Sequence, residues 1–151
     1  CSAWVTRSPI FMTVADVVGD SFSQGDTLIV RAETVGGYSF YRHLQDLQSI
    51  SAIEARAYDY VFLQDQSQAA ARYASNHKQY RQLLLDAADL VNRIRIYSPK
   101  AKIFIERTWA YEGSRYGGFD SLENFDNLIE KGAKQMASKT KTSVSPIGQA
   151  L

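Results

Sequence analysis

Short apolar runs alternate with longer helical patterns along the 151 residues, and this alternation limits the possible fold more than any other feature. Residues 27–32, 58–63 and 102–107 are rich in β-branched, aliphatic and aromatic side chains, which favours strands. The run 58–63 is nearly continuous in apolar side chains, as expected for a strand that is buried on both faces. A last, short strand is predicted over residues 142–147.

Helical patterns fill the intervals between the predicted strands. Residues 38–47, 75–97 and 121–138 carry apolar side chains three or four positions apart, and Ser121 is placed to cap the last of these helices. Strands that alternate with helices predict an α/β fold, with a mostly parallel sheet, helices on both faces and a single domain over residues 1–151. The predicted inward-facing residues of the last helix are Leu122, Phe125, Ile129, Ala133 and Met136.

The composition excludes several classes of protein. With 45% hydrophobic residues, 22% charged residues and a formal net charge of +1, the chain is neither disordered nor basic enough for general nucleic-acid binding. Its single cysteine, Cys1, excludes a disulfide scaffold, and no apolar run reaches the roughly 20 residues that a membrane helix needs. Metal-ligand spacings and glycine-rich phosphate loops are both missing, so we predict no metal and no organic cofactor.

Three polar, aromatic or glycine-rich segments follow the predicted strands, at residues 36–39, 64–67 and 108–111. Because ligands bind beyond the carboxyl ends of parallel strands, we expect the three segments to meet at one edge of the sheet. The structural alternatives are a turn, a polar helix cap and packing over the sheet. In the third segment, Trp109 and Tyr111 are candidate substrate-binding residues, since their flat apolar faces with a polar edge suit a sugar.

The residue types in the first two segments suit the stabilisation of an oxyanion. The backbone N–H of Gly37 can point into a site because no Cβ obstructs it. The side-chain amide of Gln66 is a second candidate donor, and Gln64 is a candidate substrate-binding residue. Asp65 could instead orient a neighbouring group.

The sequence contains two histidines, and neither is favoured as a catalytic base. His43 lies beside Arg42 in the predicted helix 38–47, where a structural hydrogen bond is the preferred interpretation. His77 lies at the start of the predicted helix 75–97 and is interpreted as a surface residue.

Four blocks of sequence carry a resemblance to a known superfamily. They are Gly-Gly-Tyr-Ser-Phe-Tyr-Arg-His-Leu at 36–44, Tyr-Asp-Tyr-Val-Phe-Leu-Gln-Asp-Gln-Ser at 58–67, Thr-Trp-Ala-Tyr at 108–111 and Ser-Pro-Ile-Gly at 145–148. Together they cover about residues 34–150 and resemble a little-characterised bacterial branch of the SGNH (GDSL-like) hydrolases.

The resemblance implies a flavodoxin-like, three-layer α/β/α fold and serine-dependent hydrolysis of esters, often of acetylated carbohydrates, through an acyl-enzyme. It gives Gly37 the place of the backbone donor and Gln66 the place of the amide donor, where much of the superfamily has asparagine. The implied partner is a small-molecule or carbohydrate ester, without a cofactor, and by analogy the protein is periplasmic or secreted. The oligomeric state is not predicted.

The chain departs from the superfamily pattern in its acid and base. In the superfamily these come from an Asp-x-x-His block after the last strand, and this sequence reaches Leu151 without one. We therefore expect the base to lie outside this sequence, in a longer parent enzyme. The alternative is a catalytically inactive domain of the same fold that binds glycans through Trp109, Tyr111 and Tyr116 or serves a structural purpose.

The nucleophile has two interpretations. Ser21 ends a Gly-Asp-Ser triplet, and a serine on a tight turn after a strand can act as a nucleophile. However, only 14 residues separate Ser21 from Gly36, which is short for a helical crossover and a second strand. In the other interpretation residues 9–18 form the first helix, and the first strand and nucleophile lie upstream of Cys1. We expect the latter, with a domain incomplete at both ends, and retain Ser21 as the candidate within this sequence.

Overall fold

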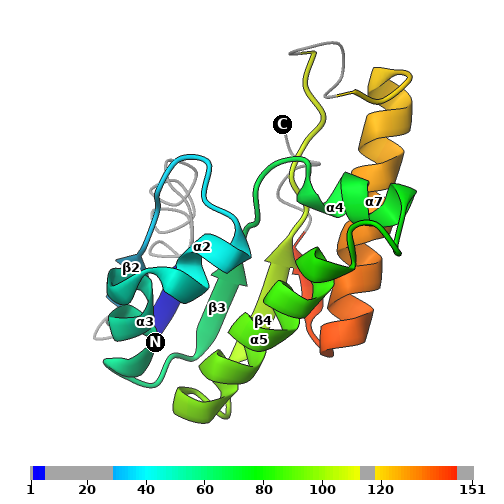
Figure 1. Cartoon of the computed structure of the whole chain (residues 1–151). Helices are drawn as coiled ribbons and strands as arrows, with labels where there is room; N and C mark the ends of the chain where they lie inside the picture. Colours follow the sequence, from blue (N-terminus) through cyan, green and yellow to red (C-terminus); the bar gives the residue numbers. More distant parts are fainter. Residues whose placement is uncertain (1, 6–28, 113–117, 146–151) are drawn as a thin grey trace, which may run out of the picture.

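The computed structural model describes residues 2–5, 29–112 and 118–145, which form a parallel sheet and the helices packed on it (Figure 1). The strand order is β2-β1-β3-β4-β5, and every described pairing is parallel. This is the flavodoxin-like order, so the predicted α/β fold is confirmed. The strands are β1 (Ser2–Val5), β2 (Ile29–Ala32), β3 (Tyr60–Leu63), β4 (Lys102–Glu106) and β5 (Ser143–Ser145).

Strand β1 corrects the expectation that the first strand lies upstream of Cys1. It lies between β2 and β3, with Ala3 opposite both Val30 and Tyr60. The strand is only four residues long, too short for an alternating or continuous apolar pattern to stand out. The predicted helix 9–18 and Ser21 lie outside the described residues.

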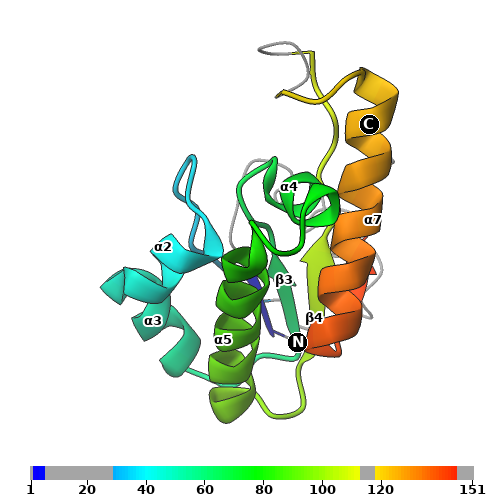
Figure 2. The same ribbon diagram turned by 45° about the vertical axis from the view of Figure 1, so that its right-hand side comes forward.

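The helices lie against the sheet and against one another (Figures 1 and 2). Helix α5 packs against α2, α3 and α7, and α7 also packs against β4 and β5. None of the described helices combines the length and apolar character needed to cross a bilayer. The helices are α2 (Phe40–Gln45), α3 (Leu47–Glu54), α4 (Ala69–Ser75), α5 (Arg81–Tyr97) and α7 (Leu122–Thr140).

The core lies between α5 and the middle strands. Val61 and Leu63 of β3 are fully buried, and Leu90 and Ile94 of α5 belong to the same apolar cluster. Burying one such aliphatic side chain contributes roughly 1.5–3 kcal/mol, so this contact holds the sheet and helix together. Four of the five inward-facing residues predicted for α7 are buried, but Leu122 is not, because it is the first helical residue and is 37% exposed.

Two predicted helices differ from the structure in their bounds. The prediction over 38–47 corresponds to α2 alone, because Asp46 ends that helix. The Asp46 side chain accepts the Ser49 N–H at 3.0 Å to begin α3, which was not predicted. The prediction over 75–97 is wrong at its start, because Asn76 adopts an extended conformation and α5 begins only at Arg81.

Helix α4 was not predicted, because its alanine-rich sequence has little apolar periodicity. It packs against α7 so closely that the backbone carbonyl of Ala70 approaches Gly132. The absence of a side chain at Gly132 permits this contact, which holds the start of α4 beside the carboxyl ends of the strands.

Candidate functional site

The carboxyl ends of β2 and β3 lead into two loops that share a small cavity of about 80 Å³. The meeting of segments 36–39 and 64–67 at one sheet edge, predicted from the sequence, is therefore observed. Because β1 separates β2 from β3, the two loops approach the cavity from opposite sides of β1. The cavity is lined by Val35, Gly37, Tyr38, Gln64, Asp65, Gln66 and Ser67.

Gly37 lies at the tip of a tight turn between β2 and α2. The Tyr38 N–H donates to the Val35 carbonyl at 3.1 Å, and Gly37 has a φ of 78°. That conformation is costly for residues with a Cβ, so the turn favours glycine here. The chain then enters α2, where the Ser39 hydroxyl accepts the Arg42 N–H. The turn and the cap together place the backbone of Gly37 at the cavity.

Gln66 is oriented by the start of α4. Its side-chain Oε1 accepts the Gln68 N–H at 3.2 Å, and its backbone carbonyl accepts the Ala69 N–H at 2.8 Å. With Oε1 used as an acceptor, the other end of the amide is the donor, as an oxyanion site requires. Gln64, in contrast, is buried and is only 6% exposed.

Asp65 connects the two loops. Its Oδ1 accepts the backbone N–H of Phe40 at 3.1 Å and that of Gln66 at 2.7 Å. Its Oδ2 is buried and has no hydrogen-bond partner among the described residues. Burial raises the pKa of Asp65 to about 7, against the opposing effect of the two N–H donors, and the charge of Asp86 raises it further.

Comparison with known proteins agrees with this geometry at the level of fold. No protein-family model and no curated protein matches the chain by sequence. Its structure is similar to that of a candidate SGNH hydrolase from Slackia heliotrinireducens, with a TM-score of 0.69, 18% identity and coverage of 99% of this chain and 79% of that one. The chain has the SGNH-hydrolase fold.

Two further structures share the SGNH-hydrolase fold with this chain. One is a catalytic mutant of an acetylxylan esterase from Geobacillus stearothermophilus, with a TM-score of 0.63, 14% identity and coverage of 99% of this chain and 76% of that one. The other is phospholipase A1 from Streptomyces albidoflavus, with a TM-score of 0.60, 10% identity and coverage of 99% and 80%. The superfamily resemblance stated from the sequence blocks is thus confirmed as a resemblance of fold.

The third predicted segment, residues 108–111, lies beside the loop at residues 64–67 and does not line the cavity. The Thr108 hydroxyl donates to the Ser67 carbonyl at 3.1 Å. The Gln68 side-chain amide donates to the Tyr111 hydroxyl at 2.8 Å, while the Tyr111 ring packs edge-on against Phe125. Trp109 is half-buried and is not among the residues that line the cavity. The loop therefore supports the cavity from outside.

Neither histidine is among the residues that line this cavity. Buried His43 shares a 2.8 Å hydrogen bond between Nδ1 and the Ser49 hydroxyl, which in turn donates to Asp46. Burial lowers the pKa of His43, and Asp46 opposes that shift, so the structural role predicted for His43 is confirmed. His77 lies between α4 and α5, not at the start of a helix as predicted, and its Nε2 pairs with Gln135 on the surface.

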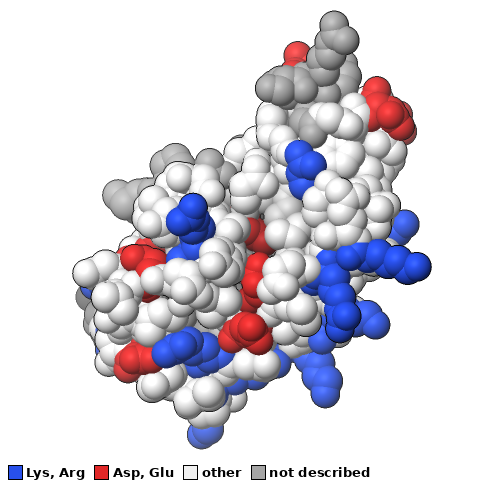
Figure 3. All heavy atoms as spheres, viewed as in Figure 1, with Lys and Arg blue, Asp and Glu red and all other residues white. Residues whose placement is uncertain are grey.

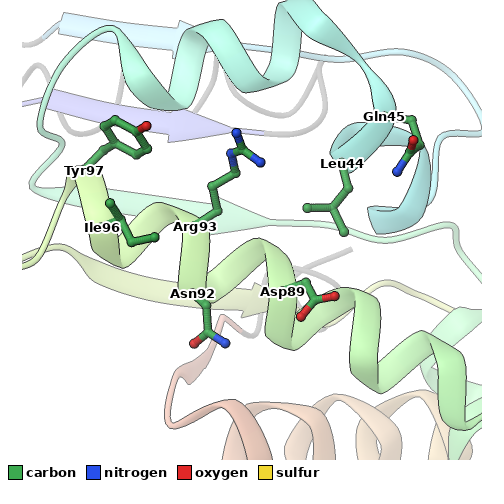
Figure 4. Close-up of a pocket in the computed structure, with 7 residues that line it drawn as sticks. All are labelled: Leu44, Gln45, Asp89, Asn92, Arg93, Ile96 and Tyr97. Atoms are coloured by element: carbon green, nitrogen blue, oxygen red, sulfur yellow. The ribbon is translucent and has the colours of Figure 1, made fainter.

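A wider, open groove of about 560 Å³ lies between α2 and α5 (Figure 4). It runs along the helices, and none of the loops that follow the strands lines it within the described residues. It is also not a metal site, because no group of three histidine, cysteine or acidic side chains in the described part of the chain could hold an ion. Its lining residues are Leu44, Gln45, Asp89, Asn92, Arg93, Ile96 and Tyr97.

Proposed function

We propose that this protein is a serine ester hydrolase that acts on small acyl esters. The observation that carries the proposal is the cavity at the carboxyl edge, which receives Gly37 and Gln66 from opposite sides of β1. The stabilisation of a tetrahedral oxyanion requires N–H donors at one site, and these two residues both line the cavity and can supply them. Solved structures with the same fold that are named esterases and a phospholipase support this class of reaction.

In the proposed reaction, a serine hydroxyl oxygen bonds to the ester carbonyl carbon while a base takes the hydroxyl proton. The carbonyl oxygen becomes an oxyanion and accepts hydrogen bonds from the Gly37 N–H and the Gln66 amide. Collapse of this intermediate expels the alcohol, which takes the proton, and leaves the acyl group on serine. Water then attacks in the same manner and releases the acid. We assign the base to neither His43 nor His77, since neither lines the cavity.

The size of the cavity favours a small acyl group. A volume of about 80 Å³ corresponds to about two or three water molecules. An acetyl group fits this space and a long acyl chain does not. We therefore propose an acetylated carbohydrate as the substrate, with Gln64 and the loop at Trp109 and Tyr111 as candidate contacts for the sugar. The kcat/KM for p-nitrophenyl acetate should exceed that for p-nitrophenyl octanoate at least tenfold, and equal values would contradict the small acyl pocket.

The nucleophile is tested in the full-length protein, by serine substitutions together with a fluorophosphonate probe. We expect Ser21→Ala to abolish both hydrolysis of p-nitrophenyl acetate and labelling, and Ser23→Ala to change neither. Ser8 is the first serine after β1 in the sequence, and loss of both signals in Ser8→Ala alone would move the nucleophile there. A wild type that shows neither turnover nor labelling would contradict the proposal that the protein is a serine hydrolase. If such a wild type binds glycans and the Trp109→Ala variant does not, the alternative of a catalytically inactive, glycan-binding domain would be favoured.

Gln66→Glu is the sharper test of the amide donor. This variant keeps the Oε1 acceptor for the Gln68 N–H but removes the NH2 group. We expect kcat for p-nitrophenyl acetate to fall by about 10²-fold or more, as it does when one oxyanion donor is lost, and Gln66→Ala to fall similarly. Gln79→Ala, on the exposed connection between α4 and α5, should leave kcat unchanged. An unchanged kcat in Gln66→Glu would remove Gln66 from the site.

A further inference from the structure

We infer that Asp65 is a positioning residue, which sets the spacing between the two oxyanion donors by holding the Gly37 loop against the Gln66 loop. The inference rests on the proposed function and adds to it a residue that contributes no donor of its own. It follows from the position of one carboxylate oxygen, Oδ1, between two backbone N–H groups on different loops.

The two contacts of Oδ1 reach the two donors by short stretches of chain. Phe40, which donates at 3.1 Å, is the first residue of α2, is fully buried and follows Gly37 by only three positions. Gln66, which donates at 2.7 Å, is itself the proposed amide donor. A shift of Oδ1 would therefore change the position of both donors relative to each other.

The contact also spans a gap that the sheet does not close. β2 and β3 do not pair with each other, because β1 lies between them. The loops that follow them are thus anchored on strands about two interstrand spacings apart, roughly 9.5 Å. A hydrogen bond from Phe40 to Asp65 links these loops across the end of β1, where the sheet's own hydrogen bonds do not hold them together.

The environment of Asp65 makes its protonation state part of this role. Oδ2 is buried without a described partner, and burial raises the pKa of Asp65 to about 7. Among the described residues, the one charge that acts on Asp65 is that of Asp86 on α5, which raises its pKa further. Figure 3 shows acidic side chains along the middle of this face of the molecule. From α2 the facing group is the uncharged Phe40 N–H, which lowers the pKa. In its neutral form the carboxyl still accepts through Oδ1, but it places no negative charge beside the developing oxyanion.

The neutral form is therefore the active one in this proposal. Ionisation above pH 7 would oppose the developing negative charge, because charges interact strongly where water is excluded. Asparagine at this position would keep the oxygen acceptor and could not ionise. The two roles, acceptor and neutral group, can thus be separated by two substitutions.

The experiment compares Asp65→Ala and Asp65→Asn with the wild type, each as the full-length protein, in hydrolysis of p-nitrophenyl acetate between pH 5 and 9. We expect Asp65→Ala to lower kcat by about 50-fold or more, with KM changed less than about threefold, because only the transition state needs both donors. We expect Asp65→Asn to retain kcat within about fivefold at pH 6 and to lack the decline in kcat that the wild type shows above pH 7. Asp89→Asn, an exposed carboxylate of α5, is the matched control and should keep the wild-type profile.

The outcomes separate this inference from the proposed function. A wild type that is inactive towards all aryl esters overturns both. An active wild type with a fully active Asp65→Ala overturns only the inference. The inference would also be overturned if Asp65→Ala and Asp65→Asn lost kcat equally and Asp65→Asn kept the wild-type decline in kcat above pH 7. Such a result would indicate a residue with a structural role only. If Asp65→Ala fails to fold by circular dichroism, the pH profile of Asp65→Asn decides the question.

Discussion

Replacing Gly132 with alanine is expected to destabilise the protein by about 3 kcal/mol or more. A Cβ at this position would lie 1.9 Å from the carbonyl oxygen and 2.5 Å from the carbonyl carbon of Ala70. Both are backbone atoms of α4, so no side-chain rotation relieves the clash, and the two helices must separate. Alanine is intrinsically better than glycine in a helix by only about 1 kcal/mol, which does not offset overpacking of this severity.

Gly36→Ala provides the matched control for this prediction. A Cβ at Gly36 would meet no atom within 4 Å, and its φ lies outside the left-handed region. Its stability should remain within about 1 kcal/mol of the wild type. Urea unfolding followed by circular dichroism at 25 °C measures both variants. Wild-type stability in Gly132→Ala would mean that α4 does not pack against α7 in this way.

The second large effect is on the pH dependence of stability, through Asp65. Its pKa is about 7 in the folded protein and 3.8 as an ordinary carboxyl. The folded state therefore binds more protons at Asp65 than the unfolded state does between these values. The contribution of Asp65 to stability is full below about pH 4 and is lost as the pH rises to 7. A shift of about three pKa units corresponds to a loss on the order of 4 kcal/mol over this window.

Asp65→Asn isolates this contribution, because the amide cannot ionise. Free energies of unfolding from urea titrations at pH 4.5, 5.5, 6.5 and 7.5 should show the wild type losing stability relative to the variant as the pH rises. Comparison of the two proteins cancels other groups, such as His43, whose lowered pKa makes stability fall as the pH drops below about 6.5. Parallel curves for the two proteins would show that the buried carboxyl is ionised over the whole range.

The sequence contained enough information to predict which loops meet at the site. Strands and helices that alternate dictate a parallel sheet, and a parallel sheet brings its carboxyl ends to one edge, which places Gly37 near Gln66. The positions of Trp109 and Tyr111 could not be predicted in this way. Nothing in the local sequence reveals whether an aromatic side chain faces a cavity or packs on a neighbour such as Phe125.

The errors in the fold prediction arise where tertiary contacts outweigh local pattern. The helical spacing around Asp46 continues through the break between α2 and α3, and only the side-chain cap reveals the new helix start. The alanines of α4 have no apolar stripe, and their burial depends on Gly132, more than sixty positions away. Likewise, Asp65 belongs to a polar run, and its role depends on Phe40, 25 positions earlier.

The hydrogen bond from Phe40 to Asp65 also provides a local probe of how often the two loops separate. The Phe40 amide proton is held by a side chain across β1 rather than by the helix or the sheet, because Phe40 is the first residue of α2. Its rate of exchange with deuterated solvent therefore reports opening of the loop pair, while amides inside α5 report unfolding of the whole domain. The ratio of the two rates measures how much less stable the closed edge is than the sheet beneath it.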